Sequence, residues 1–187
     1  MRVIAGRLKG RRLFSPNWDG LRPTSDRLRE TLFDVLGARV EGARVLDGCA
    51  GTGAVGIEAL SRGAEHVVFI ERDHRAVALI KRNLSVCGLS DRYTLRQAAL
   101  PGALCGSLIG AFDLILLDPP YGAFDIGAIL TGAVGCLAPR GRLVLERARR
   151  DTPRADPLLE SLRSVRAGDS VLEFFVPATP LTDTATE

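Results

Sequence analysis

The 187-residue sequence has few of the residues that mark secreted, metal-binding or membrane-spanning proteins. Its four cysteines are widely spaced and form no C-x-x-C pair, and it has only two histidines. A zinc site and a disulfide framework are therefore not predicted. No apolar run approaches the ~18 residues of a membrane-spanning helix, and the first ten residues mix charged with apolar side chains, unlike a secretion signal. We expect a cytoplasmic protein that binds no metal.

Aromatic residues are also scarce, at 5%, and the net charge is only +3. That charge is unevenly distributed. Residues 1–30 hold eight Arg or Lys against three Asp or Glu, whereas the remaining residues carry two more acidic than basic side chains. A basic segment attached to a near-neutral body is typical of proteins that bind nucleic acid, although a solvated basic surface gives the same pattern.

The order of the predicted elements indicates an α/β fold. Residues 2–5 and 11–14 flank glycines and predict a short hairpin, and a helix is predicted over residues 24–36. From residue 43 strands alternate with helices, which favours a parallel, doubly wound sheet closed by an antiparallel hairpin. The strands are predicted at 43–47, 66–71, 92–97, 112–118, 141–146, 164–167 and 171–176, and the further helices at 54–62, 74–87, 125–137 and 156–163.

A glycine-rich segment, DGCAGTGAVG at residues 47–56, joins the first strand after residue 43 to a helix. It contains the pattern G-x-G-x-x-G, which in this context predicts a backbone that approaches a nucleotide-like ligand. A tight turn without a ligand is the alternative. Glu71, at the end of the next strand, can accept hydrogen bonds from a ribose diol. Asp47 favours a cationic ligand, S-adenosylmethionine, over a dinucleotide with an anionic pyrophosphate.

The strand at residues 112–118 leads into Asp118-Pro119-Pro120-Tyr121. The carboxyl ends of parallel strands border one crevice, so this loop is predicted to face the glycine-rich segment. Asp118 and the carbonyl of Pro119 can accept the two N–H groups of a conjugated amine, and Tyr121 offers a flat face for an unstacked base. A Pro-Pro turn with a capping Asp118 is the alternative. The two segments together favour methyl transfer to an amine, whereas a dehydrogenase has no use for the second.

Three further segments resemble the RsmD family. Residues 1–13 (MRVIAGRLKGRRL) resemble its N-terminal hairpin, residues 21–33 (LRPTSDRLRETLF) the start of its helix, and residues 56–64 (GIEALSRGA) its first domain helix. Proteins of that family methylate the N2 amine of a guanine in 16S rRNA of the bacterial small ribosomal subunit. The resemblance extends to about residue 176 and implies the same activity, with S-adenosylmethionine as the methyl donor.

The resemblance also implies an architecture and a set of roles. It implies a Rossmann-like class I methyltransferase fold with a mostly parallel seven-stranded sheet, an antiparallel edge hairpin and an N-terminal hairpin and helix. Residues 1–37 would dock RNA, residues 38–177 would form the methyltransferase domain of a monomer, and residues 178–187 would form a tail. The implied cofactor-binding residues are Asp47, Gly51, Gly53, Glu71, Gln97 and Ala98; the catalytic residues are Asp118, Pro119 and Tyr121; the RNA-binding residues are Arg7, Lys9, Arg11, Arg12, Arg22 and Arg27, joined by Arg29.

Two other kinds of function fit parts of the sequence. Methyltransferases that act on adenine N6, cytosine N4 or a protein amide use a similar Asp-Pro-Pro-aromatic loop on similar nitrogens. A non-catalytic ribosome-assembly protein that binds RNA needs only the basic segment. The presence of Asp47, Glu71 and Asp118 together argues against the non-catalytic interpretation.

Overall fold

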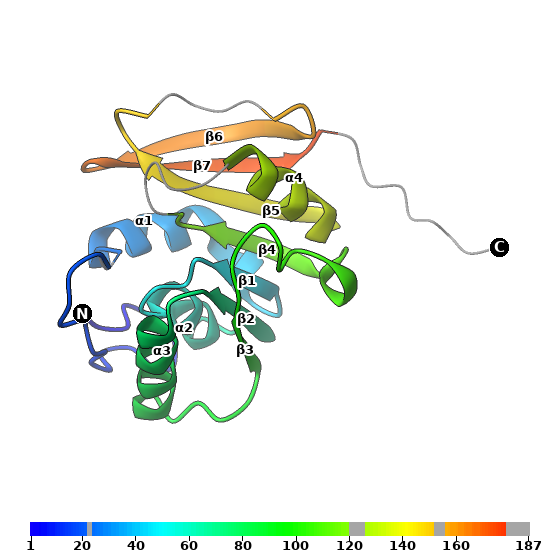
Figure 1. Ribbon diagram of the computed structural model, residues 1–187. Helices are drawn as coiled ribbons and strands as arrows, with labels where there is room; N and C mark the ends of the chain where they lie inside the picture. Colours follow the sequence, from blue (N-terminus) through cyan, green and yellow to red (C-terminus); the bar gives the residue numbers. More distant parts are fainter. Residues whose placement is uncertain (22–23, 120–125, 152–155, 179–187) are drawn as a thin grey trace.

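A seven-stranded sheet forms the centre of the molecule in the computed structural model, which describes residues 1–21, 24–119, 126–151 and 156–178 (Figure 1). The strand order is β3-β2-β1-β4-β5-β7-β6, and the first five strands are parallel. β7 pairs antiparallel with both β5 and β6, so the predicted α/β fold with an antiparallel edge is confirmed. The strands are β1 (Arg44–Gly48), β2 (His66–Glu71), β3 (Tyr93–Gln97), β4 (Phe112–Leu117), β5 (Leu137–Ala148), β6 (Leu159–Ala167) and β7 (Ser170–Pro177).

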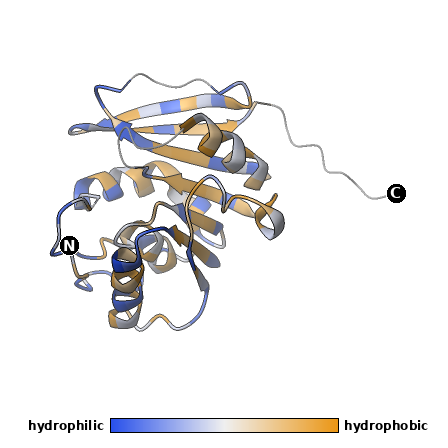
Figure 2. Ribbon diagram, viewed as in Figure 1, coloured by the Kyte–Doolittle hydropathy of each residue, from blue (hydrophilic) through white to orange (hydrophobic). Residues whose placement is uncertain are grey.

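Helices cover both faces of this sheet. The helices are α1 (Asp26–Leu36), α2 (Ala54–Ser61), α3 (His74–Val86) and α4 (Ile126–Cys136), with short 3-10 turns at Gly37–Val40 and Gly106–Leu108. Successive strand side chains point to opposite faces, so Val45 packs in the core with α1, α2 and α3 whereas Leu46 packs in the core with α4. Figure 2 shows the resulting concentration of hydrophobic residues in the central strands. None of the helices in the described ranges is long and apolar enough to cross a bilayer.

The N-terminal segment is a tight hairpin rather than a pair of strands. Its two arms meet at a single antiparallel bridge between Arg2 and Arg12. Val3 and Leu13 are buried in the core that α1, α2 and α3 share. The hairpin is therefore packed into the body of the molecule and is more than a charged arm on its surface.

Buried polar groups of α2 fix this hairpin in place. The carboxylate of Glu58 is completely buried and accepts the N–H groups of Ile4 (2.7 Å) and Ala5 (2.9 Å). The same carboxylate pairs with Arg62 at 2.8 Å. The hydroxyl of Ser61 donates to the carbonyl of Ala5 at 2.6 Å. Since buried polar groups are costly when unpaired, this set of bonds specifies where the hairpin lies.

The prediction of a helix at residues 156–163 is wrong, because β6 begins at Leu159 and runs to Ala167. The spacing of Leu158, Leu159 and Leu162 mimics one face of a helix, but only Leu159 is buried. Pairing with β7 along the edge of the sheet satisfies the backbone of this segment and overrides the weak local preference for a helix.

Candidate active site

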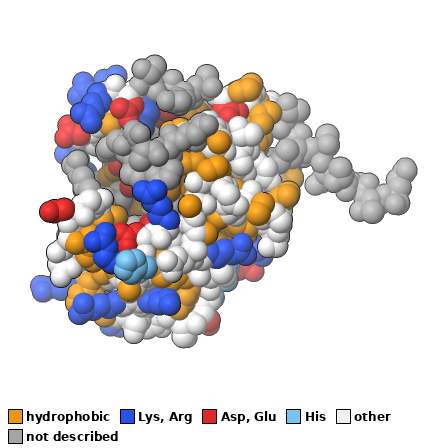
Figure 3. All heavy atoms as spheres, viewed as in Figure 1, with side chains coloured by type: hydrophobic (Ala, Val, Ile, Leu, Met, Phe, Trp, Pro, Cys, Tyr) orange, Lys and Arg blue, Asp and Glu red, His pale blue; other side chains and the backbone are white. Residues whose placement is uncertain are grey.

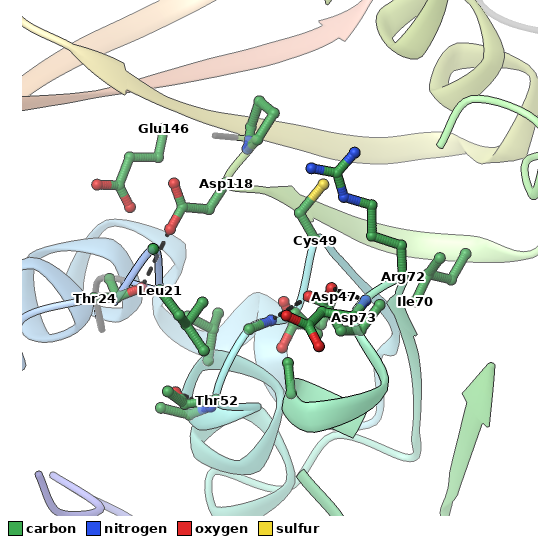
Figure 4. Close-up of a pocket in the computed structure, with 18 of the residues that line it drawn as sticks. Leu21, Thr24, Asp47, Cys49, Thr52, Ile70, Arg72, Asp73, Asp118 and Glu146 are labelled. Atoms are coloured by element: carbon green, nitrogen blue, oxygen red, sulfur yellow. Dashed lines mark hydrogen bonds between the residues drawn. The ribbon is translucent and has the colours of Figure 1, made fainter. Parts of the chain in front are cut away.

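A cavity of about 610 Å³ opens at the carboxyl ends of β1, β2 and β4 (Figure 4). This is the place where ligands bind in open α/β sheets, and the volume lies within the range of about 300–1,000 Å³ that is common for small-molecule sites. Residues 18–21 before α1, the end of β5 and the turn between β6 and β7 complete the walls. On the face shown in Figure 3, acidic side chains lie in a hollow that Lys and Arg side chains border.

The three glycines of the G-x-G-x-x-G pattern serve different structural needs. Gly51 has a positive φ of 55° and lines the cavity. Gly53 also has a positive φ, 73°, and precedes α2. A Cβ on Gly56 would lie 2.3 Å from the ring of Phe69, so this glycine permits close packing of α2 on β2. Among the three, Gly51 alone is in the cavity wall, which assigns the other two to the shape of the turn.

Asp47 is a buried carboxyl group at the base of the cavity. Its Oδ2 accepts the N–H of Gly56 at 2.8 Å. Burial raises the pKa of Asp47 to about 7, the hydrogen bond from Gly56 opposes that rise, and the nearby charge of Glu71 adds to it. A cation in the cavity would stabilise the ionised form of this group.

Glu71 holds the glycine-rich turn against the end of β2. Its Oε2 accepts the N–H of Gly51 and its Oε1 accepts the N–H of Asp73, both at 2.9 Å. The N–H of Ala98 donates to the carbonyl oxygen of Glu71 at 3.0 Å, and Ala98 lines the cavity. Gln97 is exposed and is not among the lining residues. The structure therefore brings Asp47, Gly51, Glu71 and Ala98 together and leaves Gln97 outside the wall.

Asp118 and Pro119 follow β4, the strand paired with β1, and line the same cavity. The hydroxyl of Thr24 donates to Oδ2 of Asp118 at 3.4 Å. The pKa of Asp118 is raised well above its usual value, first by burial and then by the carboxyl groups of Glu146 and Asp47. Tyr121, the third predicted catalytic residue, and Arg22 lie outside the described residues.

Glu146 was not predicted from the sequence, although it lines the cavity beside Asp118. It lies near the carboxyl end of β5, the strand next to β4. The sequence offered one signal for Glu146: it is an acidic residue near the end of a predicted strand, as Asp118 is. Thr24 and residues 18–21, which also line the cavity, carried no comparable signal.

Cys49 lies in the glycine-rich turn with a positive φ of 61°. Burial and the surrounding carboxylates raise the pKa of its thiol to about 12. The thiol is thus protonated at neutral pH and is a poor nucleophile. Within the described ranges, no group of three or more His, Cys, Asp or Glu side chains is arranged to hold a metal ion.

The predicted RNA-binding residues differ in exposure. Arg29 is completely buried, and its guanidinium donates to the carbonyl of Arg2 at 2.7 Å and to the carboxylate of Asp26 at 2.6 Å. The expectation that Arg29 contacts RNA is therefore wrong, because the side chain joins α1 to the hairpin. The other described members of the set are exposed: Arg7, Lys9, Arg11, Arg12 and Arg27.

Comparison with solved structures defines the class of protein. The chain aligns with YhhF from Escherichia coli with a TM-score of 0.81 at 26% identity, covering 94% of this chain and 96% of that one. A hypothetical protein of Thermus thermophilus aligns with a TM-score of 0.77 at 31% identity, over 93% and 98% of the two chains. With its sheet order, the chain has the Rossmann-like fold of class I methyltransferases.

The chain belongs to the family described as "Conserved hypothetical protein 95", whose model matches residues 1–176. This is the RsmD family, so the resemblance inferred from the sequence is confirmed. A relative from Haemophilus influenzae, named ribosomal RNA small subunit methyltransferase D, is 40% identical over 123 residues. That alignment covers 65% of this chain and 64% of the relative, slightly under two thirds of its length.

Proposed function

We propose that this protein transfers a methyl group from S-adenosylmethionine to the exocyclic N2 amine of a guanine in 16S rRNA of the small ribosomal subunit. The observation that carries the proposal is the meeting, in one cavity, of Asp118 and Pro119 with Asp47 and Glu71. The first pair can hold an amine, and the second suits the methyl donor. The name of the Haemophilus influenzae relative supports rRNA as the substrate.

The residues of the cavity fit S-adenosylmethionine. Asp47 is buried with a pKa of about 7, so it gains from a cationic partner. S-adenosylmethionine has two cationic groups, a sulfonium and an ammonium. Glu71 keeps lone pairs for a ribose diol after accepting the N–H groups of Gly51 and Asp73. When bound, the cofactor supplies an electrophilic methyl group.

Asp118 and Pro119 prepare the amine. The lone pair of an exocyclic amine is delocalised into its ring, which makes the nitrogen a poor nucleophile. Acceptance of its two N–H groups by Asp118 and by the carbonyl of Pro119 localises that lone pair. Because these acceptors are in place before the reaction, they stabilise the charge that develops on the nitrogen without reorganising.

The exposed basic residues of the hairpin and α1 are suited to RNA phosphates. Such contacts position a substrate without reading its sequence. We propose that Arg7, Lys9, Arg11, Arg12, Arg22 and Arg27 hold the RNA while one base enters the cavity, and that a single copy of the chain suffices. The reaction would take place in the cytoplasm, where the small subunit is assembled.

Transfer of radioactive methyl groups tests this proposal. The purified protein is incubated with S-adenosyl-[methyl-³H]methionine and small subunits that lack the modification. We expect label in the 16S rRNA. Label in ribosomal protein, or none in the rRNA although the protein binds S-adenosylmethionine, would contradict the proposal.

Affinity for S-adenosylmethionine should rise with pH up to about 7. A raised carboxyl pKa means that Asp47 is protonated in the free protein below about 7, whereas a cationic ligand needs the ionised form. At pH 6 about one tenth of the protein has this group ionised, so binding should be about tenfold weaker than above pH 7. Calorimetry between pH 5 and 6.5, more than one unit below the usual pKa of an α-amino group, measures the rise, which should be nearly tenfold per pH unit well below 7. A flat profile for the unchanged protein, or an unaltered slope in Asp47→Asn, would remove Asp47 from the cation site.

Neutralising the basic hairpin should weaken RNA binding and reduce its dependence on salt. The variant carries Arg7→Gln, Lys9→Gln, Arg11→Gln and Arg12→Gln, which keep the buried side chains of the hairpin. Each lost phosphate contact should reduce the slope of log affinity against log salt by about 0.7–0.9. The matched control is Arg39→Gln with Arg140→Gln, two exposed residues at the amino-terminal end of the sheet. Equal slopes for the two variants would make the hairpin purely structural.

A further inference from the structure

Glu146 lies beside Asp118 where β4 ends next to β5 (Figure 4). Leu117 of β4 is paired with Leu145 of β5 in parallel register, and Asp118 and Glu146 are the residues that follow these two in the chain. Both acidic side chains line the cavity. Figure 4 shows the two carboxyl groups turned toward one another from adjacent strand ends. The cavity thus offers two carboxyl groups, not one, where an amine would enter.

Separate hydroxyl groups hold the two carboxyls. The hydroxyl of Ser170 donates to Oε1 of Glu146 at 2.8 Å, and that of Thr24 donates to Oδ2 of Asp118 at 3.4 Å. The carboxyl group of Glu146 also raises the pKa of Asp118, so the pair resists double ionisation. Each carboxyl group has its own hydroxyl partner, so both groups are kept at the cavity when a substrate enters.

Two adjacent carboxylates match a base that presents two adjacent donor nitrogens. Guanine has N1–H next to its N2 amine. Adenine and cytosine present an unprotonated ring nitrogen beside the exocyclic amine, and a side-chain amide presents a carbonyl oxygen. A carboxylate facing either acceptor would be repelled. Resting on the proposed function, we propose that Glu146 accepts the N1–H of the guanine whose amine Asp118 holds, and thereby selects guanine.

Both carboxyl groups must be ionised before both can accept hydrogen bonds from the base. The other charged or titratable groups that line the cavity come from the ends of β1 and β2, from the segment before α1, from the start of α3 and from the turn between β6 and β7: Asp19, Asp47, Cys49, Glu71, Arg72, Asp73, Arg75 and Asp169. Asp47 raises the pKa of Asp118 further, because its negative charge disfavours a second ionised carboxyl. Entry of the donor edge of a guanine stabilises the doubly ionised pair, and any proton that the pair carries is released to water.

The test compares two bases that differ at N1. The position methylated by the unchanged protein is first mapped in small-subunit rRNA. Subunits are then reconstituted with guanine or 2-aminopurine at that position. 2-Aminopurine keeps the exocyclic amine but has an acceptor at N1. Rates of methyl transfer are measured for the unchanged protein, for Glu146→Gln and for Glu160→Gln, an exposed residue of β6 that is not in the cavity wall.

We expect the unchanged protein and the Glu160 variant to prefer guanine over 2-aminopurine by at least about tenfold, the effect of one charge-assisted hydrogen bond. Glu146→Gln should lose activity on guanine and gain relative activity on 2-aminopurine, because its amide can donate to N1. The preference of this variant for guanine over 2-aminopurine should be lower than that of the unchanged protein by at least about tenfold. The ratio of the two preferences cancels effects of the missing O6 of 2-aminopurine, in the manner of a double-mutant cycle.

Three results would overturn the inference. In the first, Glu146→Gln slows methyl transfer to guanine and to 2-aminopurine equally, so the preference for guanine is unchanged. In the second, Glu146→Gln changes neither rate. In the third, the unchanged protein methylates 2-aminopurine as fast as guanine. The last measurement uses no variant and holds even if Glu146→Gln fails to fold. If the unchanged protein binds S-adenosylmethionine but methylates no guanine of the rRNA, the proposed function fails instead, so the two failures are distinguishable.

Discussion

Replacing Asp118 with alanine is expected to slow methyl transfer by about a hundred- to a thousandfold, the usual cost of removing one preorganised group that stabilises developing charge. The affinity for S-adenosylmethionine should change little, because the residues proposed to hold it are Asp47, Gly51 and Glu71 and not Asp118. Single-turnover rates measure the first quantity and calorimetry the second. Asp118→Asn keeps an acceptor oxygen without the charge, so its rate of methyl transfer should lie between those of the unchanged protein and Asp118→Ala.

The control for this change is Asp34→Ala, which removes an exposed carboxylate from α1. It should leave both rate and affinity unchanged. If Asp118→Ala also retained the rate of the unchanged protein, Asp118 would have no part in the chemistry. If it lost S-adenosylmethionine binding instead, Asp118 would belong to the cofactor site.

Replacing Glu58 with alanine is expected to destabilise the protein by about 3 kcal/mol, within the range for breaking a buried ion pair. The substitution leaves the N–H groups of Ile4 and Ala5 without their acceptor and Arg62 without its partner. For a chain of this size the thermal midpoint should fall by about 6–12 °C. Thermal unfolding followed by circular dichroism measures the shift.

Glu30→Ala is the matched control, because Glu30 is an exposed residue of α1. Its effect should stay within about 0.5 kcal/mol. Equal midpoints for the two variants would show that the hairpin adds nothing to stability. A large effect of Glu58→Ala explains why RNA binding is better tested with surface charges than by deleting the hairpin, whose Val3 and Leu13 are part of the core.

Periodicity predicted much of this fold because most elements obey a local pattern. The apolar strands β1, β2 and β4 are buried on both faces, and a solid apolar run is the signal of such strands. The prediction for β6 was wrong because β6 is an edge strand. Six of its nine residues are exposed, so the spacing of its leucines was free to resemble a helix. Only pairing with β7, a contact not visible in the local sequence, determines its conformation.

The sequence predicted those residues of the site that belong to recognisable motifs. Asp47, Gly51, Glu71 and Asp118 stand at motif positions, and the structure gathers them around one cavity. Glu146 belongs to no such motif, and its place beside Asp118 follows from strand order. Arg29 shows the opposite error, since charge alone suggested a surface role for a side chain that is fully buried.

The most direct test of the central claim is the identity of the methylated nucleoside. The rRNA labelled by the purified protein is digested to nucleosides and analysed by mass spectrometry alongside the tritium label. The account predicts that the label elutes as N2-methylguanosine. Label in a methylated adenosine or cytidine, or in guanosine methylated at another atom, would contradict it.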